Sequence, residues 1–109
     1  MVQALPGDPV ASVIARQVLR SGTSVGANYR AACRARSKID MIAKLKIVEE
    51  EADETLYWLE LLVEANIVPR ARLEPLMTET NELLAMTVAS IITLRKSTNR
   101  QSSIADRKS

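Results

Sequence analysis

Carboxylates form the densest group of side chains that could hold a metal ion. Residues 49–54 read EEEADE, which places five carboxylates within about two helical turns. Helical bundles can gather such side chains around metal ions. However, Glu49 to Glu51 point around most of a helix circumference, and the chain contains no histidine to complete a ligand set. We therefore expect no metal at Glu51, Asp53 or Glu54, and read the run as a solvated acidic face.

The absence of histidine also removes the commonest general base. No Ser-His-Asp or Cys-His arrangement can exist within the chain. Gly22 and Gly26 lie four residues apart and are followed by no Lys-Ser or Lys-Thr pair, so they do not predict a phosphate-cradling loop. We expect a protein that is not an enzyme and that binds no cofactor.

Basic side chains are concentrated on the N-terminal side of the acidic run. They are Arg16, Arg20, Arg30, Arg34, Arg36 and Lys38. Each phosphate that such a side chain neutralises releases counterions, so the patch predicts an interface for RNA or DNA. Tyr29 lies beside it and could stack on a base. The alternative is that these side chains solvate a helix or pair with acidic residues of a neighbouring molecule.

Charge changes sign twice along the chain, although the formal net charge is only +2. Residues 1–48 are basic, residues 49–82 are strongly acidic, and residues 83–109 are basic again. The acidic segment supports an alternative function, in which the face from Glu49 to Glu64 docks a basic protein such as a polymerase or reverse transcriptase. In that case the protein is an adaptor, and nucleic acid need not touch it.

Three long helices account for the spacing of apolar residues. Asp8 followed by proline has the chemistry of an N-cap and first helical position, and Ser37 has that of a second N-cap. These signals predict helices over residues 9–35, 38–66 and, beginning near residue 71, to about 97. The chain is short enough for one domain, 1–97, and the polar segment 98–109 is expected to be a flexible tail.

One face of each helix is expected to be buried. On the first helix it consists of Val10, Ile14, Val18, Ser21, Val25, Asn28 and Ala32. On the second it consists of Met41, Ile42, Leu45, Val48, Ala52, Leu56, Leu59, Leu62 and Val63. On the third it consists of Leu73, Leu76, Met77, Thr80, Leu83, Leu84, Thr87, Ile91 and Leu94. The fold class is therefore all-α, an antiparallel up-and-down bundle.

Ile47, Trp58 and Leu61 lie well off the main stripe of the second helix. A helix with two apolar faces cannot bury both inside one thin bundle. We therefore predict that these three residues anchor contacts between copies in a cyclic homo-oligomer, and that Trp58→Ala changes the size of the assembly.

Asn28 and Cys33 are the remaining residues of interest. Asn28 lies on the buried face of the first helix, where its amide needs a partner, and we expect a bond to Glu54 or to a backbone carbonyl. Cys33 is the only cysteine, which fits a reducing cytoplasm and a small buried residue; a reactive thiol or an intersubunit bridge is the alternative. No apolar run approaches the roughly 20 residues of a membrane span, so we expect a cytoplasmic protein.

A family resemblance rests on the segment SVGANYRAA, residues 24–32, and on the long helix that follows it. Together they resemble the four-helix-bundle family encoded in intervening sequences of bacterial 23S ribosomal RNA genes, over roughly residues 10–94. An Arg precedes a small-residue seam leading to Ala-Asn, and the long helix carries an inward Glu. Here Arg20, Ala27, Asn28 and Glu54 occupy those positions.

The resemblance implies a helical bundle that assembles into a five-fold ring and has no established catalytic activity. It also extends to the accessory variability protein of diversity-generating retroelements, a basic ring that binds a reverse transcriptase and nucleic acid.

The sequence departs from the family pattern in two places. Only Met1 to Leu5 precede the Pro-Gly turn, so the first helix of the bundle is expected to be truncated and to leave a groove unless oligomer contacts cover it. The family's Ala-Glu-Gly is replaced by Arg30, Ala31 and Ala32, which removes its acidic residue.

Overall fold

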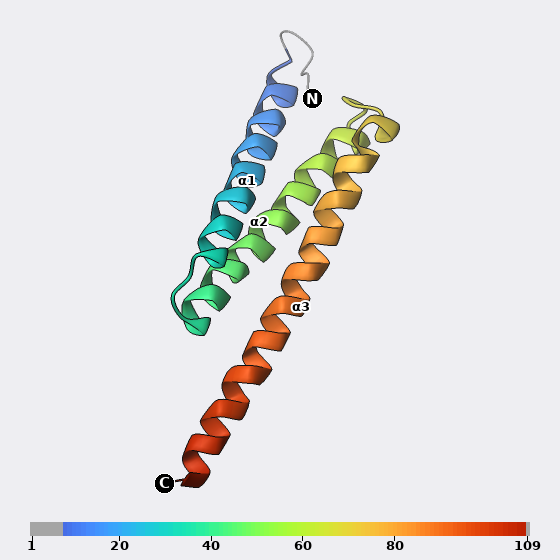
Figure 1. Cartoon of the computed structure of the whole chain (residues 1–109). Coiled ribbons are helices and arrows are strands. Elements are labelled where there is room, and N and C mark those ends of the chain that lie inside the picture. The colour runs from blue at the N-terminus through green and yellow to red at the C-terminus, as the bar shows by residue number, and fades with distance from the viewer. Residues whose placement is uncertain (1–7, 109) are drawn as a thin grey trace.

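Three helices make up the part of the protein that the structure describes. The computed structural model describes the backbone of residues 8–108 and the side chains of residues 8–98. The helices are α1 (Pro9–Cys33), α2 (Lys38–Glu64) and α3 (Arg70–Lys108), and they run in alternating directions (Figure 1). No strand occurs within these described residues. The predicted all-helical antiparallel bundle is therefore confirmed, whereas the predicted truncated first helix falls on residues outside the described ones.

Side-chain caps begin the first two helices where the sequence predicts them. Oδ1 of Asp8 accepts hydrogen bonds from the backbone N–H groups of Val10 at 3.0 Å and Ala11 at 3.2 Å. Oγ of Ser37 accepts one from the N–H of Asp40 at 3.0 Å. Each cap satisfies backbone donors that have no partner within the helix, which fixes where the helix starts.

The ends of α1 and α2 lie two residues before their predicted positions, at Cys33 and Glu64. After α2 the chain reverses through Asn66, whose φ of 58° is in the left-handed region. Asparagine tolerates this conformation better than most residues, and the N–H of Ile67 then donates to the carbonyl of Leu62 at 3.0 Å. The reversal is what brings α3 back along α2.

α3 continues as a helix to Lys108, past the predicted end near residue 97. The flexibility expected of segment 98–109 stays a prediction. With 39 residues, against 27 in α2, α3 is about 18 Å longer at 1.5 Å per residue. It therefore projects past the turn between α1 and α2, as Figure 1 shows. The polar composition of this segment does not stop the helix.

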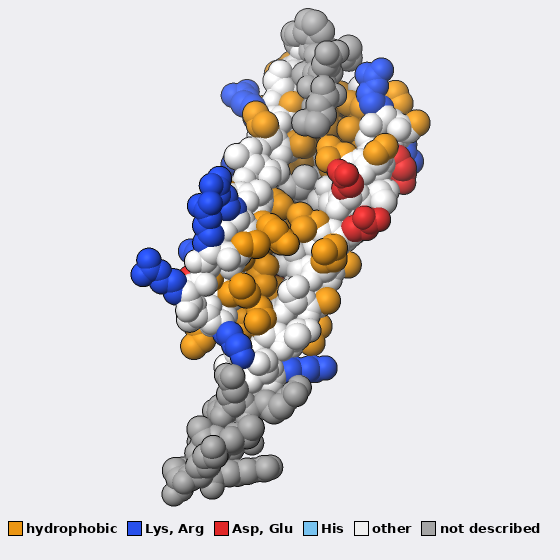
Figure 2. Space-filling view, viewed as in Figure 1, with side chains coloured by type: hydrophobic (Ala, Val, Ile, Leu, Met, Phe, Trp, Pro, Cys, Tyr) orange, Lys and Arg blue, Asp and Glu red, His pale blue; other side chains and the backbone are white. Residues whose placement is uncertain are grey.

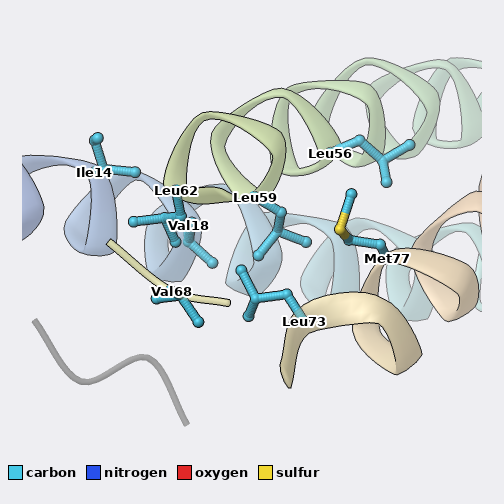
Figure 3. Close-up of a cluster of buried hydrophobic side chains, with 8 residues drawn as sticks. All are labelled: Ile14, Val18, Leu56, Leu59, Leu62, Val68, Leu73 and Met77. Atoms are coloured by element: carbon cyan, nitrogen blue, oxygen red, sulfur yellow. The ribbon is translucent and has the colours of Figure 1, made fainter. Parts of the chain in front are cut away.

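The core lies where α2 packs between its two neighbours. Its largest cluster joins Ile14 and Val18 of α1 to Leu59 and Leu62 of α2, with Leu73 of α3 on the third side (Figure 3). A second layer centres on Val25, Val48 and Ala52, and a third joins Ala32, Leu45 and Ile91. The predicted faces of α2 and α3 are confirmed at these positions.

The predicted buried face of α1 is correct except at its first turn. Val10 is 59% exposed, and Ala11 is buried in its place. The core of α1 also contains Ser21, whose hydroxyl lies 2.8 Å from that of Thr55 on α2, with Thr55 as donor. A small residue at this point lets the two helices approach closely, and the hydroxyl pair leaves no polar side-chain atom unsatisfied there.

An open groove runs between α1 and α3. Both helices pack on α2, but no Cα atoms of α1 and α3 come within 8 Å of each other in the described residues. The space between them, about 580 Å³, has Leu19 and Gly22 on one wall, Leu76 and Leu83 on the other, and Thr55 on its floor. Figure 2 shows hydrophobic side chains gathered along it. We call it the α1–α3 groove.

Candidate functional site

The predicted basic patch lies at the C-terminal end of α1 and in the turn that follows. Arg30, Arg34 and Arg36 are all exposed there, and none of them forms an ion pair with any side chain of residues 8–98. Lys38, the first residue of α2, is half-buried. Four of the six predicted residues are thus gathered at one end of the bundle.

Arg20, by contrast, is engaged within its own chain. Its Nη2 atom lies 2.5 Å from Oε1 of Glu54, and its Nη1 atom lies 3.4 Å from Oε2 of Glu51, both on α2. The hydrogen bond with Glu54 raises the pKa of the Arg20 guanidinium above its ordinary value. The predicted role of Arg20 as a nucleic-acid contact is therefore less well supported than that of the other arginines, because its charge already has carboxylate partners.

The same cluster orients Trp58. Its indole Nε1–H donates to Oε1 of Glu54 at 3.2 Å, so one carboxylate oxygen accepts from both Trp58 and Arg20. The bond from Arg20, and after it the bond from Trp58, lower the pKa of the Glu54 carboxyl group. Glu54 therefore joins α1 to α2 and fixes the indole on the surface of α2.

Arg16 lies apart from the turn, because it lines the α1–α3 groove and is exposed. It is the one charged residue among those that line the groove. Sequence position placed it in the patch, but more than three helical turns separate it from Arg30 along α1. The structure does not bring Arg16 into the basic end.

Two basic residues that the sequence analysis missed lie on α3, directly before a residue that contacts the start of α2. Nζ of Lys38 donates to Oγ of Ser97 at 2.6 Å, which ties α3 to the start of α2. Arg95 and Lys96, both exposed, precede Ser97 directly. Counting residues along an up-down-up bundle could have found them, since residue 97 then returns to the level of residue 38.

Charge is sorted along the bundle as a consequence of this topology. The layer of Val25 and Val48 separates a basic half, residues 26–47 and 85–98, from an acidic half, residues 8–24 and 49–83. The basic half carries Arg30, Arg34, Arg36, Lys38, Lys44, Lys46, Arg95 and Lys96 against Asp40. The acidic half carries Asp8, Glu49, Glu50, Glu51, Asp53, Glu54, Glu60, Glu64, Glu74, Glu79 and Glu82 against Arg16, Arg20, Arg70 and Arg72.

Asn28 is half-buried and bonds within its own helix. Its Nδ2 atom donates to the backbone carbonyl of Ser24 at 2.9 Å and lies 3.1 Å from Oγ of the same residue. Of the two predicted partners, the backbone carbonyl is correct and Glu54 is wrong, because Glu54 is held by Arg20 and Trp58. Asn28 therefore does not link α1 to α2 in this chain.

Ile47, Trp58 and Leu61 are half-buried, and the last two pack against the largest core cluster. Their predicted role between copies stays a prediction. The most exposed large apolar side chains are instead Ile39 at 74%, Leu19 at 65% and Met86 at 62%. Of these, only Leu19 lines the α1–α3 groove.

Acidic side chains surround a smaller hollow between α2 and α3. Glu49, Glu50 and Asp53 line it together with Lys46, Leu84 and Val88. No group of three or more His, Cys, Asp or Glu side chains in the described part of the chain is arranged to hold a metal ion. What the hollow can offer is a negative, partly apolar surface.

Cys33 is exposed, so the expectation of a small buried residue is wrong. It is the last residue of α1, where the helix has already passed the core layer of Ala32. No helix in the described residues has a stretch long and apolar enough to cross a membrane.

The arrangement defines a small antiparallel helical bundle with a basic end. The model of the 23S rRNA-intervening sequence protein family matches residues 2–89, and the chain belongs to this family. A protein with unknown function from the S23 ribosomal protein family of Bacteroides thetaiotaomicron, known from its crystal structure, is 43% identical in sequence to this chain. The two structures match with a TM-score of 0.69. The match covers 72% of this chain and 73% of that one.

No curated protein matches the chain. The likeness to the accessory variability protein of diversity-generating retroelements stays a prediction, as does the five-fold ring.

Proposed function

We propose that the protein is a non-catalytic, oligomeric scaffold that binds RNA or DNA through its basic end. The observation that carries this proposal is the group of Arg30, Arg34 and Arg36, which are exposed and have no ion-pair partner among the described side chains. Uncompensated arginines attract phosphates because binding releases the counterions that surround a nucleic acid. Membership of a family named after a ribosomal RNA gene region is consistent with such a partner.

Salt dependence tests the proposal directly. Binding of fluorescein-labelled RNA and DNA, followed by anisotropy, should weaken steeply as salt is added. Reversing all three charges, with Arg30→Glu, Arg34→Glu and Arg36→Glu, should abolish binding. The matched control is Arg70→Glu with Arg72→Glu, which changes exposed arginines at the opposite end of the bundle. Absent or salt-insensitive binding by the unaltered protein would refute nucleic-acid recognition.

Self-assembly is the second part of the proposal. The apolar α1–α3 groove and exposed side chains such as Leu19 support it, since soluble monomers seldom leave contiguous apolar surface uncovered. Repeating the basic end around a symmetric assembly would increase the number of phosphate contacts in each complex. Light scattering at micromolar concentration tests this part, and a monomer would contradict it.

A protein-interaction adaptor is the competing function. The hollow lined by Glu49, Glu50 and Asp53 favours it, because the carboxylates border apolar Leu84 and Val88 and would suit a basic partner. A pull-down performed with and without nuclease separates the two functions. An adaptor retains its partner after nuclease digestion and loses it when Glu50→Lys and Asp53→Lys are introduced.

A further inference from the structure

The two rims of the α1–α3 groove carry opposite charges. Arg16 lines the groove from α1. Glu79 on α3 is exposed and stands three residues after Leu76 and four before Leu83, which both line the groove. Helical spacing therefore puts Glu79 on the groove side of α3. Neither Arg16 nor Glu79 forms an ion pair with any of the described side chains.

The walls between these rims are apolar. Leu19 on α1 is 65% exposed, and Leu76 and Leu83 on the facing wall are half-buried. Most carboxylates of the acidic half belong to α2, but the residue that α2 contributes to the groove is Thr55, on its floor. A molecule that enters the groove therefore meets apolar walls and the two rim charges, not the acidic face of α2.

A second copy of the same chain presents matching groups to this groove. When two α1 helices lie antiparallel about a two-fold axis beside Leu19, a residue before Leu19 in one copy opposes the residue equally far after it in the other. Leu19 then meets Leu19 of the second copy, which covers both exposed side chains. Arg16 opposes Gly22 of the second copy. A Cβ atom added to Gly22 would meet no other atom of its own chain within 4 Å, so the arginine stem has room there.

The position of Gly22 brings α3 of the second copy within reach of Arg16. α1 and α3 run in the same direction (Figure 1), and the second core layer places Val25 against Leu83. Three residues earlier on each helix, Gly22 lies at the level of the residue that follows Glu79. The guanidinium of Arg16 thus approaches Glu79 of the second copy, and the two-fold axis repeats this ion pair on the other side of the contact.

We propose that the α1–α3 groove is the contact between two copies of this chain, related by a two-fold axis beside Leu19, and that Arg16 of each copy pairs with Glu79 of the other. The inference rests on the proposed self-assembly and adds the symmetry of the contact and its paired residues. A single surface patch that carries both charges satisfies itself in such a contact. The ion pairs fix the register of the two helices, because a shifted register leaves both charges unpaired.

Cysteine cross-linking tests the two-fold axis. The full-length protein with Cys33→Ser has no thiol, and Leu19→Cys in this background places one thiol at the axis. Mild oxidation should then give a covalent dimer on a non-reducing gel, because a disulfide forms when the two Cα atoms lie about 4.4–6.8 Å apart. Val13→Cys in the same background is the matched control, since Val13 is 50% exposed on α1 but does not line the groove, and it should stay uncross-linked.

A charge swap tests the ion pair without altering the apolar walls. Arg16→Glu alone should raise the dissociation constant of the assembly at least about tenfold, because each contact then holds two like-charge pairs. Glu79→Arg alone should do the same. The double variant Arg16→Glu with Glu79→Arg should recover most of the loss. Arg34→Glu, the same charge reversal at an exposed position outside the groove, should leave the constant unchanged. Analytical ultracentrifugation measures all four.

The outcomes separate this contact from self-assembly as such. Assembly of the unaltered protein, without a Leu19→Cys cross-link and without recovery in the charge swap, would overturn the two-fold contact and leave self-assembly standing. A five-fold ring gives this result, since each of its contacts joins different residues of the two neighbours. A monomeric unaltered protein at micromolar concentration would refute self-assembly itself.

Discussion

Arg20 and Glu54 connect α1 to α2 on the surface of the bundle, with Nη2 and Oε1 2.5 Å apart. Because Glu54 also accepts the indole N–H of Trp58, the carboxylate holds one group from its own helix, one turn away, and one from α1. An arginine that sequence position assigned to a nucleic-acid surface thus has a partner inside the protomer. In the proposed function, contact with phosphates therefore falls to the arginines further along the chain.

The Glu54 pair predicts an acid-sensitive contribution to stability. The pKa of Glu54 is lowered in the folded state, so its contribution is complete above the ordinary carboxyl pKa of about 4.3 and is lost as the pH falls through the lower folded value. Glu54→Gln should therefore flatten the decline of melting temperature below that pH. The contribution is small, since both side chains are well exposed to solvent.

Melting curves recorded across the acidic range provide the measurement. Glu60→Gln is the control, because Glu60 lies on the same helix, is exposed and forms no ion pair in the described part of the chain. Equal acid profiles for the two variants would show that the Arg20 pair does not stabilise the fold.

Truncation at the centre of the core should be costly. Leu59 is fully buried in the largest cluster, between α1 and α3. Leu59→Ala should lower the free energy of unfolding by about 2–5 kcal/mol, because it removes apolar contacts and leaves a cavity. Ile39→Ala, at a site 74% exposed, should change it by less than about 0.5 kcal/mol. Urea denaturation measures both, and similar values for the two would contradict the assignment of the core.

The open groove predicts that added methyl groups on α1 stabilise the protein. A Cβ atom at Gly22 or Gly26 would meet no other atom within 4 Å. Since glycine costs about 0.8–1.0 kcal/mol relative to alanine inside a helix, Gly22→Ala and Gly26→Ala should each raise the free energy of unfolding by up to that amount. A loss of stability in urea titrations would mean that a second molecule occupies the space beside these glycines.

Leu19 provides a test of assembly through the groove. Leu19→Glu places a charge on the groove wall, where burying it between copies would be unfavourable. We expect the assembly to dissociate, as measured by light scattering. Val13→Glu is the matched control, because Val13 is 50% exposed on the same helix but does not line the groove. Dissociation by Val13→Glu alone would place the contact on another face of α1.

Helix positions could be predicted from the sequence because their signals are local. Asp8 and Ser37 cap the helices that they were expected to cap. The helical spacing of apolar residues identified Leu59 and Leu62 as core. The continuation of α3 to Lys108 was not predictable in the same way. The sequence of residues 98–109 is largely polar, so apolar periodicity gives no signal there.

The candidate site was only partly predictable, because it depends on which side chains meet across helices. The exposed arginines of the turn follow from their place between two helices. The partner of Arg20 and the bond between Lys38 and Ser97 depend on how the helices are rotated about their axes, which the spacing of residues along one chain does not specify. Asn28 is a further example, because its amide donates to the carbonyl of Ser24, one turn away on its own helix, and not to another helix.

The separation of charge between the two halves of the bundle gives the molecule an electric dipole along its 66 Å axis. In the field of any polyanion, such a body experiences a torque that turns its cationic end forward before contact is made. A larger fraction of collisions then occurs with the basic end facing the polyanion. Salt would slow this alignment by shortening the distance over which the field acts, so ionic strength should govern how fast the protein finds a polyanion as well as how tightly it holds one.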